Sequence, residues 1–209
     1  MRPSDAIRCQ QLPCADVDHA GYLVPAIELD PASISIILVS ESPPVEPRDD
    51  YYAPGEPLFG QTTVAAFRDA GADVSTVHDI LELGVYLTTA IKCPKTAYAI
   101  DRDTIDACSF VLQRELALFP GARTVLLMGD TAIRALNRIG VRAGVGRIFP
   151  SQPTYRLRAG HYEFRGMRLF PSYLQAGPAF YIEKSKRRMI AEDIAAALRH
   201  AAEAMAGVR

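Results

Sequence analysis

The sequence predicts a single α/β domain of 209 residues built around a mainly parallel sheet. Three short apolar runs, at residues 36–39, 85–91 and 124–128, are rich in β-branched side chains and too short for globular helices. Such continuous runs are typical of strands buried on both faces of a sheet. Segments with helical spacing lie between and after these runs, and this alternation favours right-handed crossovers within one domain.

The composition fits an ordinary globular protein, with 49% hydrophobic and 22% charged residues. The formal net charge of -1 gives no general attraction to nucleic acid, so such binding would need a local basic face. No apolar run approaches the length needed to cross a bilayer, and residues 1–5 lack the pattern of a signal peptide. We therefore expect a cytoplasmic protein without membrane contact, and we take a monomer as the default state.

The first third of the chain is mostly irregular outside its one strand. Residues 1–33 show little periodicity, so this segment needs an anchor to hold it to the domain. A polar, proline-rich loop at 45–60 follows the strand, and long loops in compact domains are commonly functional. Thr62-Thr63 can cap a helix that runs to about Ala70, and residues 74–83 predict a loop with one helical turn.

The rest of the chain alternates more regularly. Residues 155–158 and 162–165 alternate around Ala159-Gly160 and predict a β-hairpin. The other predicted elements are a helix at 103–119, a helix at 131–138 after Gly129-Asp130, a strand at 167–170 and a C-terminal helix at 181–206.

Glu41 is the first candidate for chemistry. It follows the strand at 36–39, between Ser40 and Ser42, and Pro43-Pro44 fixes the turn after it. Ligands of open α/β sheets bind outside the carboxyl ends of the strands. The alternative interpretation is a capped strand end with a solvated glutamate.

The four cysteines, Cys9, Cys14, Cys93 and Cys108, form two pairs in the sequence. Stable disulfides are uncommon in a reducing cytosol. The spacings C-x4-C and C-x14-C match neither a zinc ribbon nor a ferredoxin run. On spacing alone, free buried thiols are the first interpretation, with zinc or an iron–sulfur cluster as alternatives.

Five short motifs are spread over nearly the whole chain. They are Ser40-Glu41-Ser42-Pro43-Pro44, Gly55-Glu56-Pro57-Leu58-Phe59-Gly60, Thr88-Thr89-Ala90-Ile91-Lys92-Cys93, Cys108 with Leu127-Met128-Gly129-Asp130-Thr131-Ala132, and Phe170-Pro171-Ser172. In order and spacing they resemble the uracil-DNA glycosylase superfamily, most closely its iron–sulfur branch (family 4), which carries G-E-A-P-G, G-x-P-F-x-G, T-N-x-x-K-C, L-G-x-x-A and H-P-S. The resemblance implies a three-layer α/β/α sandwich with a central, mostly parallel four-stranded sheet.

The resemblance also changes the interpretation of the cysteines. In that branch two N-terminal cysteines join one after the second strand and one on the next helix to hold a [4Fe–4S] cluster. The four cysteines of this chain occupy those places, although C-x4-C is wider than the family's C-x2-C. A cluster would anchor residues 1–33, and zinc in the same ligands is the alternative.

A glycosylase must take the base out of the stack, read its edge and stabilise its departure. By the resemblance, Glu41 would orient or activate the attacking water, with Ser42 and Ser172 as polar helpers. Leu58 stands where the family has its stacking Phe, and Phe59 comes one residue later.

Two positions depart from the family's chemistry. Thr89 replaces the Asn that reads uracil, and a hydroxyl cannot reproduce the paired donor and acceptor of an amide. Phe170 replaces the His that stabilises the leaving base, and Phe can neither donate a hydrogen bond nor carry charge. Losing such a contact typically slows a reaction by about two or three orders of magnitude.

The resemblance further implies a DNA-binding face. In the family, the loop after the last strand wedges into the minor groove, and here Tyr173 and Leu174 occupy it. Basic side chains at the start of the C-terminal helix are candidates for phosphate contacts: Lys184, Lys186, Arg187 and Arg188. The alternative interpretation is a solvated basic surface.

Two functions follow from the resemblance. The first is a DNA glycosylase of divergent specificity that hydrolyses the N-glycosidic bond of a deaminated or damaged base in DNA repair. The second is a catalytically inactive member that binds nucleic acid through the same groove. A small nucleotide bound at Gly129-Asp130 is a more distant alternative.

Overall fold

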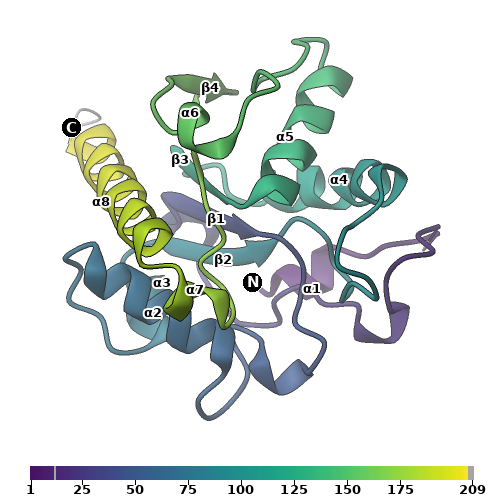
Figure 1. The fold of residues 1–209 in the computed structure, drawn as a ribbon, viewed down its shortest axis with the longest axis horizontal. Coiled ribbons are helices and arrows are strands. Elements are labelled where there is room, and N and C mark those ends of the chain that lie inside the picture. Colours follow the sequence, from purple (N-terminus) through teal and green to yellow (C-terminus); the bar gives the residue numbers. More distant parts are fainter. Residues whose placement is uncertain (12, 207–209) are drawn as a thin grey trace.

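One central sheet forms the middle layer of the protein, as the computed structural model shows for residues 1–11 and 13–206 (Figure 1). The strands β2, β1, β3 and β5 pair in parallel in that order, and β4 pairs antiparallel to β5. The predicted α/β fold with a mostly parallel sheet is therefore confirmed, and the sheet has five strands where four were expected. Their bounds are β1 (Ile36–Ser40), β2 (Val85–Thr89), β3 (Thr124–Met128), β4 (Tyr162–Phe164) and β5 (Met167–Ser172).

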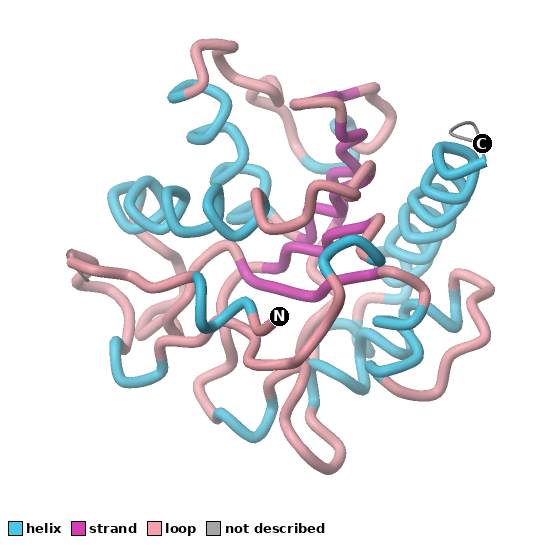
Figure 2. Tube along the Cα trace, turned by 180° about the vertical axis from the view of Figure 1, so that it is seen from behind, coloured by secondary structure: helices cyan, strands magenta, loops and turns pink. Residues whose placement is uncertain are grey.

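Helices cover both faces of this sheet, as the view from behind also shows (Figure 2). They are α1 (Pro3–Ala6), α2 (Leu58–Asp69), α3 (Val77–Glu82), α4 (Arg102–Leu116), α5 (Asp130–Arg142), α6 (Thr154–Leu157), α7 (Ala179–Ile182) and α8 (Lys184–Ala206). Single 3-10 turns lie at His19–Gly21, Pro31–Ser33 and Pro47–Asp49. Within the described part of the chain, no helix has both the length and the apolarity that a membrane span requires.

Alternating side chains of the strands supply two separate cores. Ile37 and Val39 of β1 pack with the apolar sides of α4 and α5. Ile36 and Leu38 face the opposite way and pack with α2, α3 and α8. This arrangement explains the continuous apolar run of β1, because both faces of the strand are covered.

The hairpin is displaced from its predicted place. Residues 154–157 form α6, and the hairpin joins β4 to β5. Its turn is Arg165-Gly166, where both residues have positive φ angles, 52° and 75°. A two-residue turn of this kind matches the right-handed twist of the strands. The alternating pattern of residues 155–158 therefore did not indicate a strand.

Two helix boundaries also differ from the prediction. The helix α2 begins at Leu58, directly after Pro57, so Thr62 and Thr63 lie inside it rather than at its cap. The Thr62 hydroxyl donates to the Leu58 carbonyl, 3.0 Å away. The C-terminal helix divides at Glu183 into the short α7 and the long α8.

The N-terminal segment is held to the domain by backbone pairing and a small apolar cluster. Val17 forms an isolated antiparallel bridge with Lys95, and the Leu23 N–H donates to the Lys92 carbonyl at 2.7 Å. Ile7 and Val24 pack against Val111 of α4. These contacts place both N-terminal cysteines beside α4.

Candidate functional site

The carboxyl ends of the parallel strands bring the predicted motif residues to one edge of the sheet. Glu41 directly follows β1, Thr89 ends β2 and Ser172 ends β5. Ser40 is paired with Thr89, and Met128 of β3 is paired with Ser172. This edge is the candidate site because ligands of open α/β sheets bind there.

Glu41 is the central carboxylate of this edge. Its side chain is 21% exposed, and its Oε1 accepts a hydrogen bond from the Lys95 ammonium at 3.0 Å. The Glu41 carbonyl accepts from the Ile91 N–H at 2.9 Å, which fixes the backbone. Lys95 also donates to the Tyr98 carbonyl at 3.1 Å. The ion pair was not predicted, because Lys95 belongs to the loop after another strand.

A chain of hydrogen bonds supports the residue before Glu41. The Gln175 amide N–H donates to the Tyr51 hydroxyl at 2.9 Å, and Tyr51 donates to the Ser40 hydroxyl at 2.7 Å. Ser40 in turn donates to the Thr88 carbonyl at 3.3 Å. Burial raises the pKa of Tyr51 far above its usual value, so its hydroxyl remains a donor. The chain ties the loop after β5 to the end of β1.

Asp50 is a second carboxyl near this edge, and no motif in the sequence marks it. Its side chain is 5% exposed, and its Oδ2 accepts from the Tyr52 N–H at 3.3 Å. Burial raises the pKa of Asp50, only partly offset by hydrogen bonds from the backbone of Tyr52 and Tyr51. Spacing gave no signal for it, since Asp49-Asp50 reads as part of a polar loop.

Leu58 and Phe59 are the first two residues of helix α2, and Phe59 lies beside Tyr51. The Phe59 ring is tilted against Tyr51, with centroids 5.5 Å apart, and both Leu58 and Phe59 are half-buried. Thr89 is buried, and its hydroxyl donates to the Ile91 carbonyl at 2.6 Å. The Thr89 hydroxyl is therefore already bonded within the chain.

Phe170, which the resemblance places in a base pocket, packs against helix α8, and its role at a base stays a prediction. Phe170 lies two residues before the end of β5, opposite Leu126. Its ring packs edge-on to His200 of α8 with centroids 6.0 Å apart, and the Arg168 guanidinium lies 5.1 Å from it. Phe170 belongs to the core face under α8 rather than to the carboxyl edge.

The Ser172 hydroxyl is also hydrogen-bonded inside the protein. It is fully buried, and its hydroxyl donates to Asp193 Oδ2 at 2.5 Å. Arg158 donates to the same oxygen at 2.6 Å. Ser172 thus joins β5 to α8, and its role as a polar helper stays a prediction. Ser42 is buried as well.

Most of the predicted phosphate-binding residues are paired with acids of the same chain. Arg187 makes a two-point contact with Asp69, at 2.5 and 2.9 Å. Lys186 pairs with Glu183 at 2.6 Å and Arg188 with Glu192 at 3.6 Å. Lys184 is exposed and, within residues 1–11 and 13–206, has no acidic partner at ion-pair distance. The positive field of this surface is accordingly weaker than the sequence suggests.

The two predicted wedge residues lie in the loop after β5. Tyr173 is half-buried, with the Lys186 ammonium 5.5 Å from its ring centroid. Leu174 packs over Gly129, where an added Cβ would lie 3.5 Å from the Leu174 Cβ. Both side chains are partly buried against the α8 core and retain some exposed surface.

The four cysteines gather in one neighbourhood as free thiols. Burial, together with the nearby thiols of Cys108, Cys14 and Cys9, raises the pKa of Cys93 to about 12. Burial, together with the nearby thiols of Cys14 and Cys9, raises the pKa of Cys108 to about 11. Such mutual effects require short separations.

A cavity of about 530 Å³ lies beside Cys9, Cys14 and Cys108. Across residues 1–11 and 13–206, no three His, Cys, Asp or Glu side chains are arranged to hold a single metal ion. The prediction of a cluster stays a prediction.

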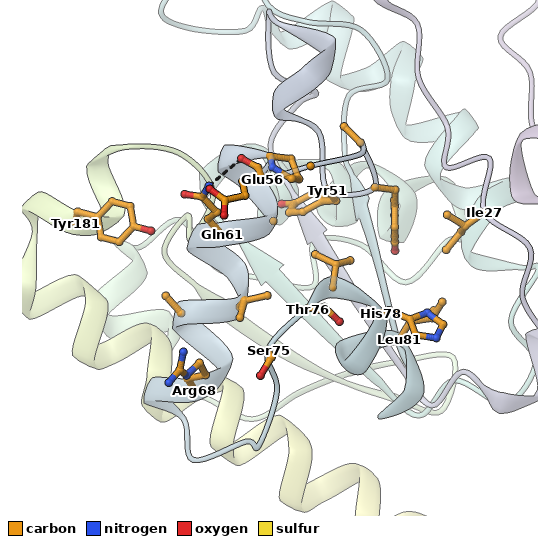
Figure 3. Close-up of a pocket in the computed structure, with 18 of the residues that line it drawn as sticks. Ile27, Tyr51, Glu56, Gln61, Arg68, Ser75, Thr76, His78, Leu81 and Tyr181 are labelled. Atoms are coloured by element: carbon orange, nitrogen blue, oxygen red, sulfur yellow. Dashed lines mark hydrogen bonds between the residues drawn. The ribbon is translucent and has the colours of Figure 1, made fainter.

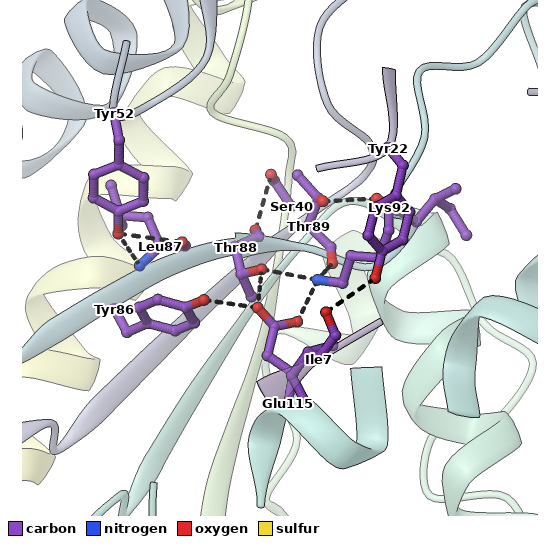
Figure 4. Close-up of polar contacts among 11 residues, drawn as sticks. Ile7, Tyr22, Ser40, Tyr52, Tyr86, Leu87, Thr88, Thr89, Lys92 and Glu115 are labelled. Atoms are coloured by element: carbon purple, nitrogen blue, oxygen red, sulfur yellow. Dashed lines mark hydrogen bonds and ion pairs between the residues drawn. The ribbon is translucent and has the colours of Figure 1, made fainter. Parts of the chain in front are cut away.

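A buried polar network lies beneath the site (Figure 4). Lys92 forms an ion pair with Glu115, and Glu115 Oε1 also accepts from the Tyr86 hydroxyl at 2.7 Å and the Thr88 hydroxyl at 2.8 Å. The Lys92 ammonium donates to the Thr88 hydroxyl at 2.8 Å.

A larger cavity, of about 840 Å³, opens between the 51–57 loop, α2 and α3 (Figure 3). Its walls include Tyr51, Gln61, Arg68 and His78. None of the predicted catalytic, metal or DNA-binding residues lines it. Tyr51 separates this cavity from the carboxyl edge, since its hydroxyl points to Ser40.

The fold and its edge define the class of protein: an α/β domain with a carboxylate at the end of its first strand. A sequence profile of the Uracil DNA glycosylase superfamily matches residues 28–198, and the chain belongs to that superfamily. Among curated proteins, none matches the chain. A crystal structure of the wild-type UNG from Nitratifractor salsuginis is similar at 15% identity and a TM-score of 0.40, over 84% of this chain and 81% of that one.

Proposed function

We propose that this protein is a DNA glycosylase of divergent specificity, which hydrolyses the N-glycosidic bond of a deaminated or damaged base. The observation that carries the proposal is the position of Glu41: a partly exposed carboxylate at the carboxyl edge of the sheet, in a member of the superfamily. A carboxylate there can accept a proton from water as the oxygen attacks C1′ of the sugar. The bond to the base then breaks, and its electron pair leaves with the base.

Two contacts in the site support a specificity other than uracil removal. The Thr89 hydroxyl is bonded to the Ile91 carbonyl, and Phe170 lies under α8. Neither side chain offers a base edge the amide or imidazole found in the family. Base recognition would then depend on Phe59, on Leu58 and on backbone groups of the edge.

The test is base release from duplex and single-stranded oligonucleotides that contain uracil, hypoxanthine, xanthine or hydroxymethyluracil. We expect abasic product from at least one of them, with loss of product in Glu41→Gln. Glu46→Gln, an exposed change in the following loop, is the matched control. No product from any substrate, or equal product from Glu41→Gln, would refute the proposal.

The second candidate is a catalytically inactive member that binds nucleic acid. The departures at Thr89 and Phe170 favour it, because both remove groups that act on the base. It predicts salt-dependent DNA binding with no base release. The binding should weaken in Lys184→Glu, because Lys184 is the member of the predicted phosphate-binding set, Lys184, Lys186, Arg187 and Arg188, that has no acidic partner at ion-pair distance in the described residues.

We also propose that Cys9, Cys14, Cys93 and Cys108 hold a [4Fe–4S] cluster, with zinc in the same ligands as the alternative. Four neighbouring thiols, of which Cys9, Cys14 and Cys108 line a cavity, fit this donor set. A cluster is larger than one ion, so its thiolates stand further apart than the ligands of a single metal. Bound there, it would anchor the N-terminal segment, since the ligands come from that segment, the loop after β2 and α4.

A further inference from the structure

Lys95 connects the candidate site to the cysteine-bearing N-terminal segment. Its ammonium holds Glu41, and its backbone forms the antiparallel bridge with Val17. Two hydrogen bonds flank that bridge: the Asp18 N–H donates to the Pro94 carbonyl at 2.8 Å, and the Thr96 N–H donates to the Asp16 carbonyl at 3.0 Å.

The same segment is fixed on its other side to helix α4. The Asp16 carboxylate accepts from the Asp101 N–H at 2.6 Å and from the Thr104 hydroxyl. Asp16 is two residues after Cys14. The position of the Lys95 backbone therefore depends on a segment that is bonded to the start of α4.

The Lys95 side chain is restrained at two points. One N–H donates to Glu41 Oε1 and another to the Tyr98 carbonyl, at 3.0 and 3.1 Å. A charge-assisted bond to Oε1 fixes the rotamer of the carboxylate and leaves the other oxygen, Oε2, available for a water molecule. Both side chains are partly exposed, at 32% and 21%, so substrate can reach them.

We infer that Lys95 is a positioning residue for Glu41, and that the 16–18 segment sets its place. The inference rests on the proposed glycosylase function. Lys95 lies outside the five motifs that resemble those of the family, so the resemblance gives it no role. The N-terminal segment is thereby connected to Glu41 through the Val17–Lys95 backbone bridge and the Lys95–Glu41 ion pair.

The first test compares Lys95→Met and Lys95→Arg with wild type in single-turnover base release, with DNA affinity measured alongside. We expect Lys95→Met to lower the rate at saturating DNA about ten- to hundredfold, the range of one charge-assisted hydrogen bond, with the Kd within about twofold. Lys95→Arg should restore most of the rate. Arg102→Met, an exposed charge at the start of α4, is the control.

Each other outcome is decisive. An unchanged rate in Lys95→Met overturns the inference and leaves the glycosylase proposal standing, because wild type and Glu41→Gln still differ. Weaker DNA binding with an unchanged saturating rate identifies a phosphate contact instead and also overturns it. No product from wild type refutes both.

A second test addresses the bridge. Asp18→Pro removes the N–H that bonds Pro94, whereas Asp18→Ala keeps it. We expect Asp18→Pro to lower the rate relative to Asp18→Ala in the wild-type background, and to have no further effect in Lys95→Met. Additive effects in the double variant would show that the segment does not act through Lys95. Circular dichroism of each variant checks that the fold is intact.

Discussion

Lys92 and Glu115 form an ion pair in which both side chains are fully buried. The pair lies directly under the end of β2, and the hydroxyls of Tyr86 and Thr88 donate to the same carboxylate. Taking two charges out of water is costly, so the pair depends on this set of hydrogen bonds. It gives the site a rigid base.

Removing one partner should therefore destabilise the protein strongly. We expect Glu115→Ala to lower the free energy of unfolding by about 3–5 kcal/mol, because it leaves the Lys92 ammonium buried without a counter-charge. Urea unfolding measures this. Glu203→Ala, an exposed change on α8, should stay within about 0.5 kcal/mol. A loss below about 1 kcal/mol in Glu115→Ala would contradict this description of the pair.

Asp50 should make stability depend on pH. Burial raises its pKa in the folded protein above the unfolded value, so its contribution is fully present at low pH and is lost as pH rises through the folded pKa. Asp50→Asn removes that titration and keeps an oxygen for the Tyr52 N–H. We expect the variant to be more stable than wild type at pH about 8, and to differ less at pH about 4, in urea unfolding. If Asp50→Asn is less stable than wild type at both pH values, the ionised Asp50 carboxylate does not destabilise the folded protein and the prediction is wrong.

The cysteines predict an effect of metal loss. If the four thiols hold a cluster, anaerobically purified protein should contain iron and sulfide and absorb visible light. Treatment with an oxidant and a chelator should then lower the melting temperature by releasing the N-terminal segment. Cys108→Ser should reproduce both effects. Protein without iron or zinc would end both the cluster and the zinc alternative.

Arg187 is expected to act in the fold rather than on DNA. It pairs with Asp69 of α2, and both side chains are about one third exposed. We expect Arg187→Ala to lower the free energy of unfolding by about 0.2–1 kcal/mol and to leave the salt slope of DNA binding unchanged. A slope reduced by about one would show instead a phosphate contact.

Some parts of the fold carry their own signature in the sequence, and others do not. β1 and β3 were located from their apolar runs because strands buried on both faces lack polar positions. The hairpin turn was missed because its signal is the pair Arg165-Gly166 with positive φ, not the alternation before it.

The site was predictable only in part, for a similar reason. The placing of Glu41 and Thr89 at one edge follows from parallel strands and needs no side-chain detail. The hydrogen-bond partners of the site residues cannot be predicted in this way. Lys95 contacts Glu41, and Asp193 contacts Ser172, only because the fold brings together segments that are far apart in the sequence. Phe170 followed the motif in sequence, yet strand register placed it under α8.

The most direct test of the central claim is the single-turnover rate of base release by wild type and Glu41→Gln on the best substrate of the panel. Glutamine keeps the shape of the side chain but accepts no proton, so we predict a rate at least about a hundredfold lower with DNA affinity unchanged. Glu46→Gln should match wild type. Equal rates for wild type and Glu41→Gln would contradict the assignment of Glu41 as the catalytic carboxylate.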